Sequence, residues 1–422
     1  MYLPEAGAAH ESREIESGDR ESPPPVARRA RRRPPFWLFL TLLGSFPVML
    51  MFAVDINDLK GAFMDSGHIW GRDFVNVWTG GRLVVENRPE AIYSFHEYLA
   101  YQQQHVGPIK PHYYSYPPSS FFLAAPFGLI PYFPALALWL AATLALFLWA
   151  ARPYVKAVPN FPLFLAAVTP AATVNVWAGH YGFLVGALWL ACFARIQRQP
   201  GRAGIFAALL TIKPHLGLLI PPILLARRAW RTIVIASAGA AFMVLVSGWV
   251  FGFELWYEYI TRMSRFQASL LQDKGSFFLA MMPGTFTSVR YTMETRDLFA
   301  WIPHILVSAG ALFLVWRAER KGAGLHDLAF IAATATFLIL PYAFNYDMTV
   351  VSLGFALVLF RQWDELGGWE RAALIGGFLS PQLTFIGKLV AFPVAPLILI
   401  AALYALVRVC RPDAKDPAPQ RA

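Results

Sequence analysis

The sequence predicts an all-α polytopic membrane protein. Of its 422 residues, 57% are hydrophobic and only 15% are charged, which is more apolar surface than a soluble chain of this length needs. Apolar runs recur from Phe36 to Val407, singly or in shorter pairs, at the roughly 17 to 25 residues that cross a hydrocarbon core of about 30 Å. Basic clusters separate these runs, as is typical of loops on the cytoplasmic side of a membrane.

The composition argues against several other classes. The net charge of +10 does not indicate nucleic acid binding, because the basic residues lie between apolar runs and form no continuous soluble face. Cys192 and Cys410 are too far apart in the expected topology to form a disulfide. The chain has no HExxH, Walker or cysteine-based metal motif, so we expect no cofactor, although a divalent metal at a phosphate stays open.

The N-terminal segment sets the topology. The first 35 residues are polar and end in ARRARRRPP, which predicts a disordered, basic cytoplasmic tail followed by an uncleaved first span at about 36–54. This arginine cluster stays inside, so the structured loop 55–116 is expected on the outer face. Within it, DINDLKGAF and EAIYSFHEYLAYQQQH are predicted to form short interfacial helices.

Six later basic runs can all lie inside if the chain crosses the membrane about twelve times, with a cytoplasmic tail at 411–422. PPSSFFLAAPFGLIP, residues 117–131, is then re-entrant or interfacial. The pair 203–212 and 215–226 is too short for full spans, and such broken helices are tolerated only inside protein or beside a cavity. After the first span, the expected spans are 134–151, 161–177, 181–194, 203–212, 215–226, 232–252, 299–316, 325–341, 347–361, 371–387 and 388–407.

Lys213 is a candidate functional residue, because a lysine within IFAALLTIKPHLGLLIPPILLA is costly unless it meets an anion or water. Pro214 breaks the helix there, and His215 adds a second donor. A phosphate is the natural partner of an ammonium beside an imidazole. The alternative is a lysine that extends to the lipid headgroups from a hairpin tip.

Three other stretches at the outer ends of spans carry polar side chains. In GRDFVNVW, Asp73 is either a reacting carboxylate, a solvated charge or the N-cap of the following helix. In AGHYG, His180 and Tyr181 occupy a glycine-bounded turn, and His180 is either functional or a neutral histidine bonded to nearby backbone. In FNYD, Tyr346 and Asp347 either line the same cavity or anchor an interface.

The order of these motifs resembles glycosyltransferase family 87. The resemblance rests on G-x-D-F, Y-P-P, AGHYG, the Lys-Pro in a short helix pair before RRAW, and FNYD, and it covers about residues 36–410. It implies a GT-C type transmembrane catalytic domain in a bacterial inner (plasma) membrane, with both termini cytoplasmic and the active site on the periplasmic, outer face. Members of this family use polyprenyl-phosphate sugars, and the best known are mannosyltransferases.

The resemblance also implies roles for individual residues. Asp73 matches the catalytic aspartate of the outer loop, and Lys213 matches the family's Lys-Pro. This chain departs from the pattern at AGHYG, where many members have Gly-Gln, and at Asp347, where a histidine is frequent. The predicted donor phosphate-binding residues are Lys213, His215 and His180, and the predicted cavity-lining residues are Asn76, Tyr116, Tyr181, Tyr346 and Asp347.

We therefore expect an inverting glycosyltransferase that moves a hexose, most plausibly mannose, from a polyprenyl-phosphate donor to an outward-facing glycolipid or glycan acceptor. A lipid-anchored donor suits an enzyme that faces away from ATP and nucleotide sugars, and one carboxylate suffices as base for inversion. Its partners are then a lipid-linked sugar donor, that acceptor and membrane lipid, without nucleic acid. The alternative is a polyprenyl-phosphate or glycolipid transporter, a flippase, in which no bond is made.

Overall fold

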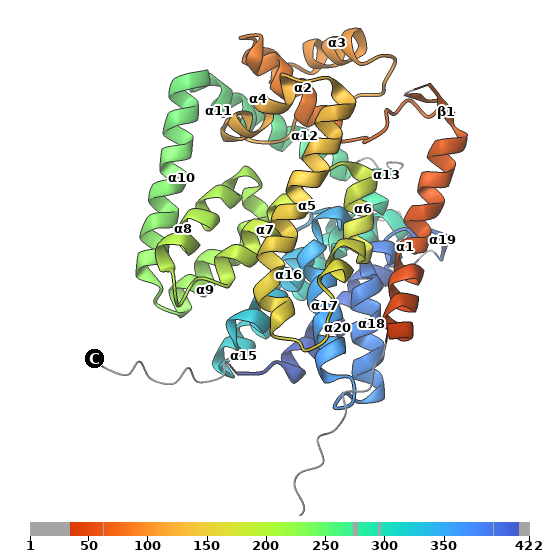
Figure 1. The fold of residues 1–422 in the computed structure, drawn as a ribbon, viewed down its shortest axis with the longest axis vertical. Helices are drawn as coiled ribbons and strands as arrows, with labels where there is room; N and C mark the ends of the chain where they lie inside the picture. Colours follow the sequence, from red (N-terminus) through yellow and green to blue (C-terminus); the bar gives the residue numbers. More distant parts are fainter. Residues whose placement is uncertain (1–33, 62, 273–276, 294–296, 391, 413–422) are drawn as a thin grey trace, which may run out of the picture.

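The computed structural model describes residues 34–61, 63–272, 277–293, 297–390 and 392–412. The expected tails 1–35 and 411–422 lie almost entirely outside these residues. The described chain is mainly helical, as expected, and Figure 1 shows its helices as a bundle with smaller elements gathered at one end. The first helix, α1 (Pro34–Asn57), includes the predicted first span.

The segment after α1 forms a small layer at that end of the bundle (Figure 1). The predicted interfacial helix in EAIYSFHEYLAYQQQH is present, as a 3-10 turn (Pro89–Tyr93) followed by α3 (Phe95–His105). The helix predicted for DINDLKGAF is wrong, because α1 continues to Asn57 and a hairpin of β1 (Leu59–Lys60) and β2 (Phe63–Met64) follows. Gly61 takes a positive φ of 71° at this turn, a conformation that ends a helix and suits a hairpin.

Residues 117–131 do not form a long helix. They form a 3-10 turn (Pro118–Ser120) and α4 (Phe121–Gly128), whose 8 residues extend only about 12 Å. α4 packs against α2 (Phe74–Val85) where Gly81 faces Gly128, and a Cβ on either glycine would overlap the backbone of the other helix. The close approach of these two short helices joins α2 to α4 within the end layer.

Among the described residues, four helices are long and apolar enough to cross a membrane: α1, α5 (Tyr132–Lys156), α10 (Trp230–Phe251) and α15 (Asp297–Arg320). Large apolar side chains on them stay exposed, and Trp249 on α10 is 83% exposed. In water this surface would be unfavourable, whereas lipid tails match it. The chain is therefore an integral membrane protein.

Shorter helices fill the space between the long ones. α7 illustrates them, since all of its residues are buried and its 12 residues extend about 18 Å, well short of the hydrocarbon core. The expected number of about twelve crossings stays a prediction. The shorter apolar helices are α6 (Pro170–Ala178), α7 (Gly182–Phe193), α8 (Pro200–Leu209), α9 (Ile220–Ala226), α16 (Leu325–Ile339), α17 (Thr349–Gln362), α18 (Gly368–Leu383) and α20 (Val394–Val409).

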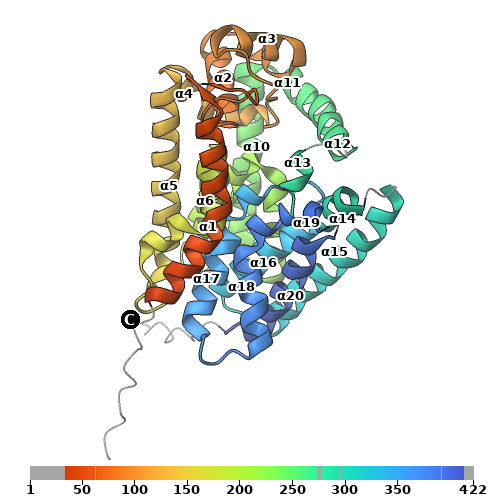
Figure 2. The ribbon, with the colours of Figure 1, turned by 90° about the vertical axis from the view of Figure 1, so that its right-hand side faces the viewer.

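The remaining short elements connect α10 with α15 and α18 with α20. In Figure 2, α11, α12 and α13 lead from the end layer back towards the bundle. These elements are α11 (Glu254–Glu258), a π-helical turn (Tyr259–Met263), α12 (Ser264–Gln272), α13 (Phe277–Ala280), α14 (Thr285–Met293) and α19 (Ile386–Leu389).

The predicted broken helix pair surrounds Lys213. α8 passes into a 3-10 turn (Leu210–Ile212), the chain bends at Lys213, and a second 3-10 turn (Pro214–Gly217) leads to α9. Lys213 has a φ of −135° and a ψ of 71°, outside the helical region, because a residue before proline avoids that region. The bend therefore presents a lysine inside the protein.

Candidate active site

A cavity of about 470 Å³ lies where the end layer meets the bundle. Its lining comes from six separate parts of the chain, so only the tertiary fold assembles it. These parts are the segment from His68 to Asn76, the loop from Lys110 to Tyr116, the turn from Trp177 to His180, the bend from Ile212 to His215, the part that contributes Tyr259, Phe266 and Met281, and the segment from Tyr342 to Tyr346.

Asp73 is half-buried and lines this cavity at the start of α2. It occupies the N-cap position, but its side chain makes no capping hydrogen bond and bonds to no other described residue. Burial raises the pKa of its carboxyl above the ordinary value, and the nearby charges of His112 and Arg72 oppose that rise. The result is a carboxylate free to accept a proton from a ligand.

Close backbone contacts fix the position of Asp73. Its amide donates a hydrogen bond to the carbonyl oxygen of Ala178, 3.0 Å away. Gly179 has a φ of 63°, and a Cβ there would overlap the carbonyl oxygen of Gly71. The motifs GRDF and AGHYG therefore touch through backbone atoms, which leaves no room for a side chain between them.

The same turn also contacts FNYD. The amide of Gly182 donates to the side chain of Asn175, and its carbonyl accepts a hydrogen bond from the hydroxyl of Thr349, both at 2.9 Å. A Cβ at Gly182 would overlap the carbonyl oxygen of Tyr346. The glycines of AGHYG thus hold GRDF on one side and FNYD on the other.

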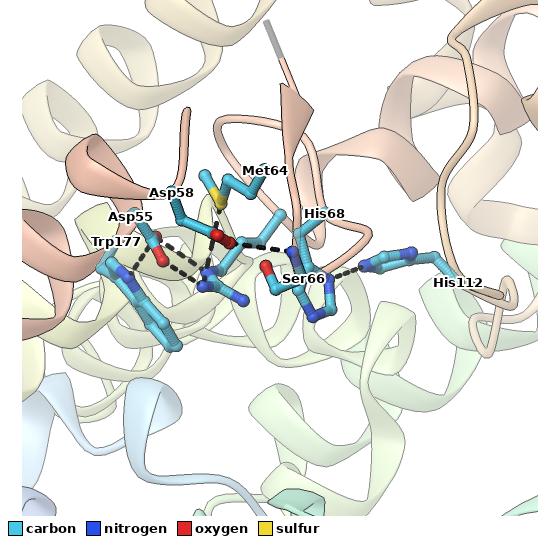
Figure 3. Close-up of polar contacts among 8 residues, drawn as sticks. Asp55, Asp58, Met64, Ser66, His68, His112 and Trp177 are labelled. Carbon is cyan, nitrogen blue, oxygen red and sulfur yellow. Dashed lines mark hydrogen bonds and ion pairs between the residues drawn. The ribbon is translucent and has the colours of Figure 1, made fainter. Parts of the chain in front are cut away.

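An ion pair beside Asp73 was not foreseen from the sequence. Arg72 donates to both carboxylate oxygens of Asp55, and its guanidinium carbon lies 4.2 Å from the ring centre of Trp177. The indole of Trp177 donates to the same carboxylate at 2.9 Å (Figure 3). Asp55 lies on α1 and Trp177 on α6, so this network ties Arg72, and with it the backbone of Asp73, to two helices of the bundle.

Lys213 is buried and forms an ion pair with Asp347, with its Nζ atom 2.9 and 2.7 Å from the two carboxylate oxygens. Its third contact is the Nδ1 atom of His180 at 3.4 Å. An ammonium group has three hydrogens to donate and no acceptor. These three contacts therefore use its full donor capacity, and a ligand anion must replace one of them.

His180 joins Lys213 to the cavity wall. Because an ammonium can only donate, Nδ1 of His180 accepts, and its Nε2–H then donates to the hydroxyl of Tyr116 at 2.7 Å. The hydroxyl hydrogen of Tyr116 remains available, and Tyr116 lines the cavity. His180 has no free donor in this arrangement, so it acts here as a link between Lys213 and Tyr116.

The other predicted site residues divide into two layers. Asn76, Tyr116, Tyr346 and His215 line the cavity, and the ring of His215 has no hydrogen-bond partner among the described residues. Tyr181 and Asp347 are buried behind the lining, where the Asp347 side chain is only 1% exposed and contacts Lys213. Both had been expected in the lining itself.

Two histidines of the lining, His68 and His112, were not among the predicted site residues. Nδ1 of His112 donates to the carbonyl of Lys110 at 2.8 Å, and the Nδ1 atom of His68 lies 3.4 Å from Nε2 of His112 (Figure 3). Burial lowers the pKa of His68 to about 3, so its ring is neutral at physiological pH. Within the described part of the chain, no group of three or more His, Cys, Asp or Glu side chains could hold a metal ion.

An apolar groove of about 280 Å³ runs between α8, α9 and α10. Its lining is almost entirely aliphatic, including Leu210, Ile220 and Leu224. Pro214 lines both this groove and the polar cavity, so the two adjoin at the bend beside Lys213.

The fold and the site together define a helical membrane protein whose polar cavity brings a carboxylate, a buried lysine and tyrosine hydroxyls together at the end of its bundle. The model of glycosyltransferase family 87 matches residues 114–341, more than half of the chain, and the protein belongs to that family. It is therefore a membrane glycosyltransferase. No curated protein and no solved structure matches the chain.

The matched segment is shorter than the expected similarity over residues 36–410. It includes Tyr116, His180, Tyr181, Lys213 and His215. Asp73, Asn76, Tyr346 and Asp347 lie outside it, so their placement beside the matched residues is a result of the fold.

Proposed function

We propose that the protein transfers a hexose, most plausibly mannose, from a polyprenyl-phosphate donor to a glycolipid or glycan acceptor, with inversion at the anomeric carbon. The observation that carries the proposal is the carboxylate of Asp73, which bonds to no other described residue and lies in the same cavity as Lys213. A transfer of this kind needs one base for the acceptor and cationic or hydrogen-bonding groups for the leaving phosphate.

In the proposed reaction, Asp73 accepts the proton of an acceptor hydroxyl while that oxygen forms a bond to the anomeric carbon. The bond from this carbon to the phosphate oxygen breaks, and its electron pair goes to the phosphate. Lys213, His215 and the hydroxyl of Tyr116 are the proposed donors to the phosphate oxygens. The first two reach the cavity from the bend between α8 and α9, and Tyr116 reaches it from the loop before α4. Attack and departure on opposite faces of the sugar invert its configuration.

The apolar groove between α8, α9 and α10 supports a lipid-linked donor. It adjoins the cavity at Pro214, so an isoprenoid chain in the groove could present its phosphate at Lys213. Most of the groove lining is apolar, and burying an isoprenoid chain there is favourable.

We further propose a GT-C type fold with about twelve crossings, cytoplasmic termini, and a cavity on the periplasmic face of a bacterial inner membrane. The support is the charge distribution. The cavity lies under the end layer, and the basic stretches at the α9–α10 and α17–α18 connections lie at the opposite end (Figure 1).

The experiment uses purified full-length protein, synthetic polyprenyl-phosphate mannose and an extract of membrane glycolipids. The protein should release polyprenyl phosphate only when the acceptor is present, and mass spectrometry should detect a glycolipid heavier by one hexose. Activity with a nucleotide sugar and none with the lipid donor would overturn the proposal. A transporter, the alternative that the sequence left open, would move the lipid across vesicles without product, but membership of a glycosyltransferase family favours transfer.

A further inference from the structure

The resting site holds a cation that is already neutralised. Lys213 projects from the bend between α8 and α9, and both oxygens of Asp347 lie within 2.9 Å of its Nζ atom. The side chains are 6% and 1% exposed, so Lys213 separates Asp347 from the cavity. A phosphate in the cavity would contact the lysine and face the carboxylate behind it.

This arrangement treats the two phosphates of the proposed reaction differently. The donor is a phosphodiester and carries one negative charge. The product, polyprenyl phosphate, is a monoester and carries about −1.5 to −2 at pH 7. The ion pair is neutral as a whole, so a phosphate that replaces His180 as a contact of Lys213 gains a hydrogen bond without the excess charge that would favour a dianion.

We propose that Asp347 sets the charge selectivity of the phosphate site, so that it retains the monoanionic diester donor and expels the dianionic monoester product. This inference rests on the proposed function. Asp347 touches neither ligand and acts through Lys213, as a positioning and specificity-determining residue. Turnover would then be limited less by product release than in a site with an unpaired cation.

The charge balance of the transfer supports this role. When the bond from sugar to phosphate breaks, the phosphate gains one negative charge, and Asp73 loses one by taking the acceptor's proton. The new charge arises next to the Lys213–Asp347 pair. One extra unit charge about 6 Å from a carboxylate, at an effective dielectric constant of about 40, changes affinity by about tenfold.

The test measures direct binding of two unreactive probes, farnesyl phosphate and its methyl ester, to detergent-solubilised full-length protein by calorimetry at pH 8. These probes share one tail and differ in charge. The wild-type protein should bind the methyl ester about tenfold more tightly. In Asp347→Asn that preference should vanish or reverse, mainly through tighter binding of farnesyl phosphate, whereas Asp347→Glu keeps the charge and should keep the preference.

Each outcome decides one point. Equal affinities, or tighter binding of farnesyl phosphate by the wild-type protein, would overturn the inference without any variant, so a poorly folding Asp347→Asn does not block the test. An unchanged ratio in a folded Asp347→Asn would overturn it as well. Lys213→Gln should weaken the binding of both probes. If Lys213→Gln weakens the binding of neither probe, the proposed phosphate site itself is wrong. That result would contradict the proposed function and would be distinct from a failure of the role given to Asp347.

Discussion

The amide of Asp73 donates a hydrogen bond to the carbonyl of Ala178, and this bond joins the start of α2 to the end of α6. The position of the carboxylate therefore depends on the backbone of a turn distant in sequence. Five predictions test this arrangement and its electrostatics.

Asp73→Asn should lower turnover by about 100-fold to 10,000-fold, because the amide keeps the shape of the side chain and accepts no proton. Asp73→Glu should recover only part of the activity. Initial rates at saturating donor measure both. Asp65→Asn is the matched control, since Asp65 is exposed and pairs only with the exposed Lys60 in the nearby hairpin. If Asp65→Asn loses the activity and Asp73→Asn keeps it, Asp73 is not the base.

The raised pKa of Asp73 gives that prediction a pH signature. In a plot of kcat/KM against pH, the apparent pKa of the acid limb should lie above the ordinary aspartate pKa of about 3.9, since the base works only when ionised. A carboxyl whose pKa is higher in the folded protein loses stability as pH rises through that pKa. Asp73→Asn should therefore melt at a higher temperature than the wild-type protein at pH 7. A lower melting temperature would mean that the charged carboxylate stabilises the fold.

Gly179→Ala should reduce turnover more than it reduces donor binding. The added Cβ would overlap the carbonyl of Gly71 at a positive φ, so the backbone that carries Asp73 must shift. Kinetics with varied donor concentration separate the two effects. Gly310→Ala serves as control, because a Cβ there meets no atom within 4 Å. Equal losses in the two variants would argue against the proposed role of the turn.

Lys213→Ala should weaken donor use and also destabilise the protein, because it leaves Asp347 buried without its partner. Breaking a buried pair from one side costs roughly 3–5 kcal/mol. Removing both charges, in Lys213→Ala with Asp347→Ala, should restore much of the stability and none of the donor affinity. Thermal melting and donor titration measure these separately. If the double variant is as unstable as Lys213→Ala alone, the unpaired charge of Asp347 is not the cause of the lost stability.

Asp55→Asn should impair both folding and activity, unlike the same substitution at the neighbouring Asp58. Asp55 is buried and accepts from Arg72 and Trp177, so its loss leaves a cation unpaired beside Asp73. We expect a loss of about 3 kcal/mol in stability and a KM that changes less than kcat. Asp58→Asn is the comparison, because the hydrogen bond that the described structure gives the Asp58 side chain is one from the backbone amide of Ser66.

Much of the class and of the local structure followed from sequence alone. Long apolar runs identified α1, α5, α10 and α15, because hydropathy and span length are properties of a continuous segment. The break at Lys213 is also a local property of the sequence, since the proline that follows it disrupts a helix. The error at DINDLKGAF came from a hairpin of two-residue strands, too short for any periodic pattern to indicate.

The partners of the site residues were decided only by the tertiary structure. Lys213 and His215 were predicted from the sequence to bind a phosphate, but nothing local showed that Lys213 is paired with Asp347 or that His180 contacts both Lys213 and Tyr116. A buried charge needs a counterion, and this need can be predicted from the sequence, whereas the identity of the counterion cannot. Packing of α6, α7, α17 and the bend at Lys213 selects it, because in a close-packed interior the backbone contacts at Gly179 and Gly182 determine which side chains meet.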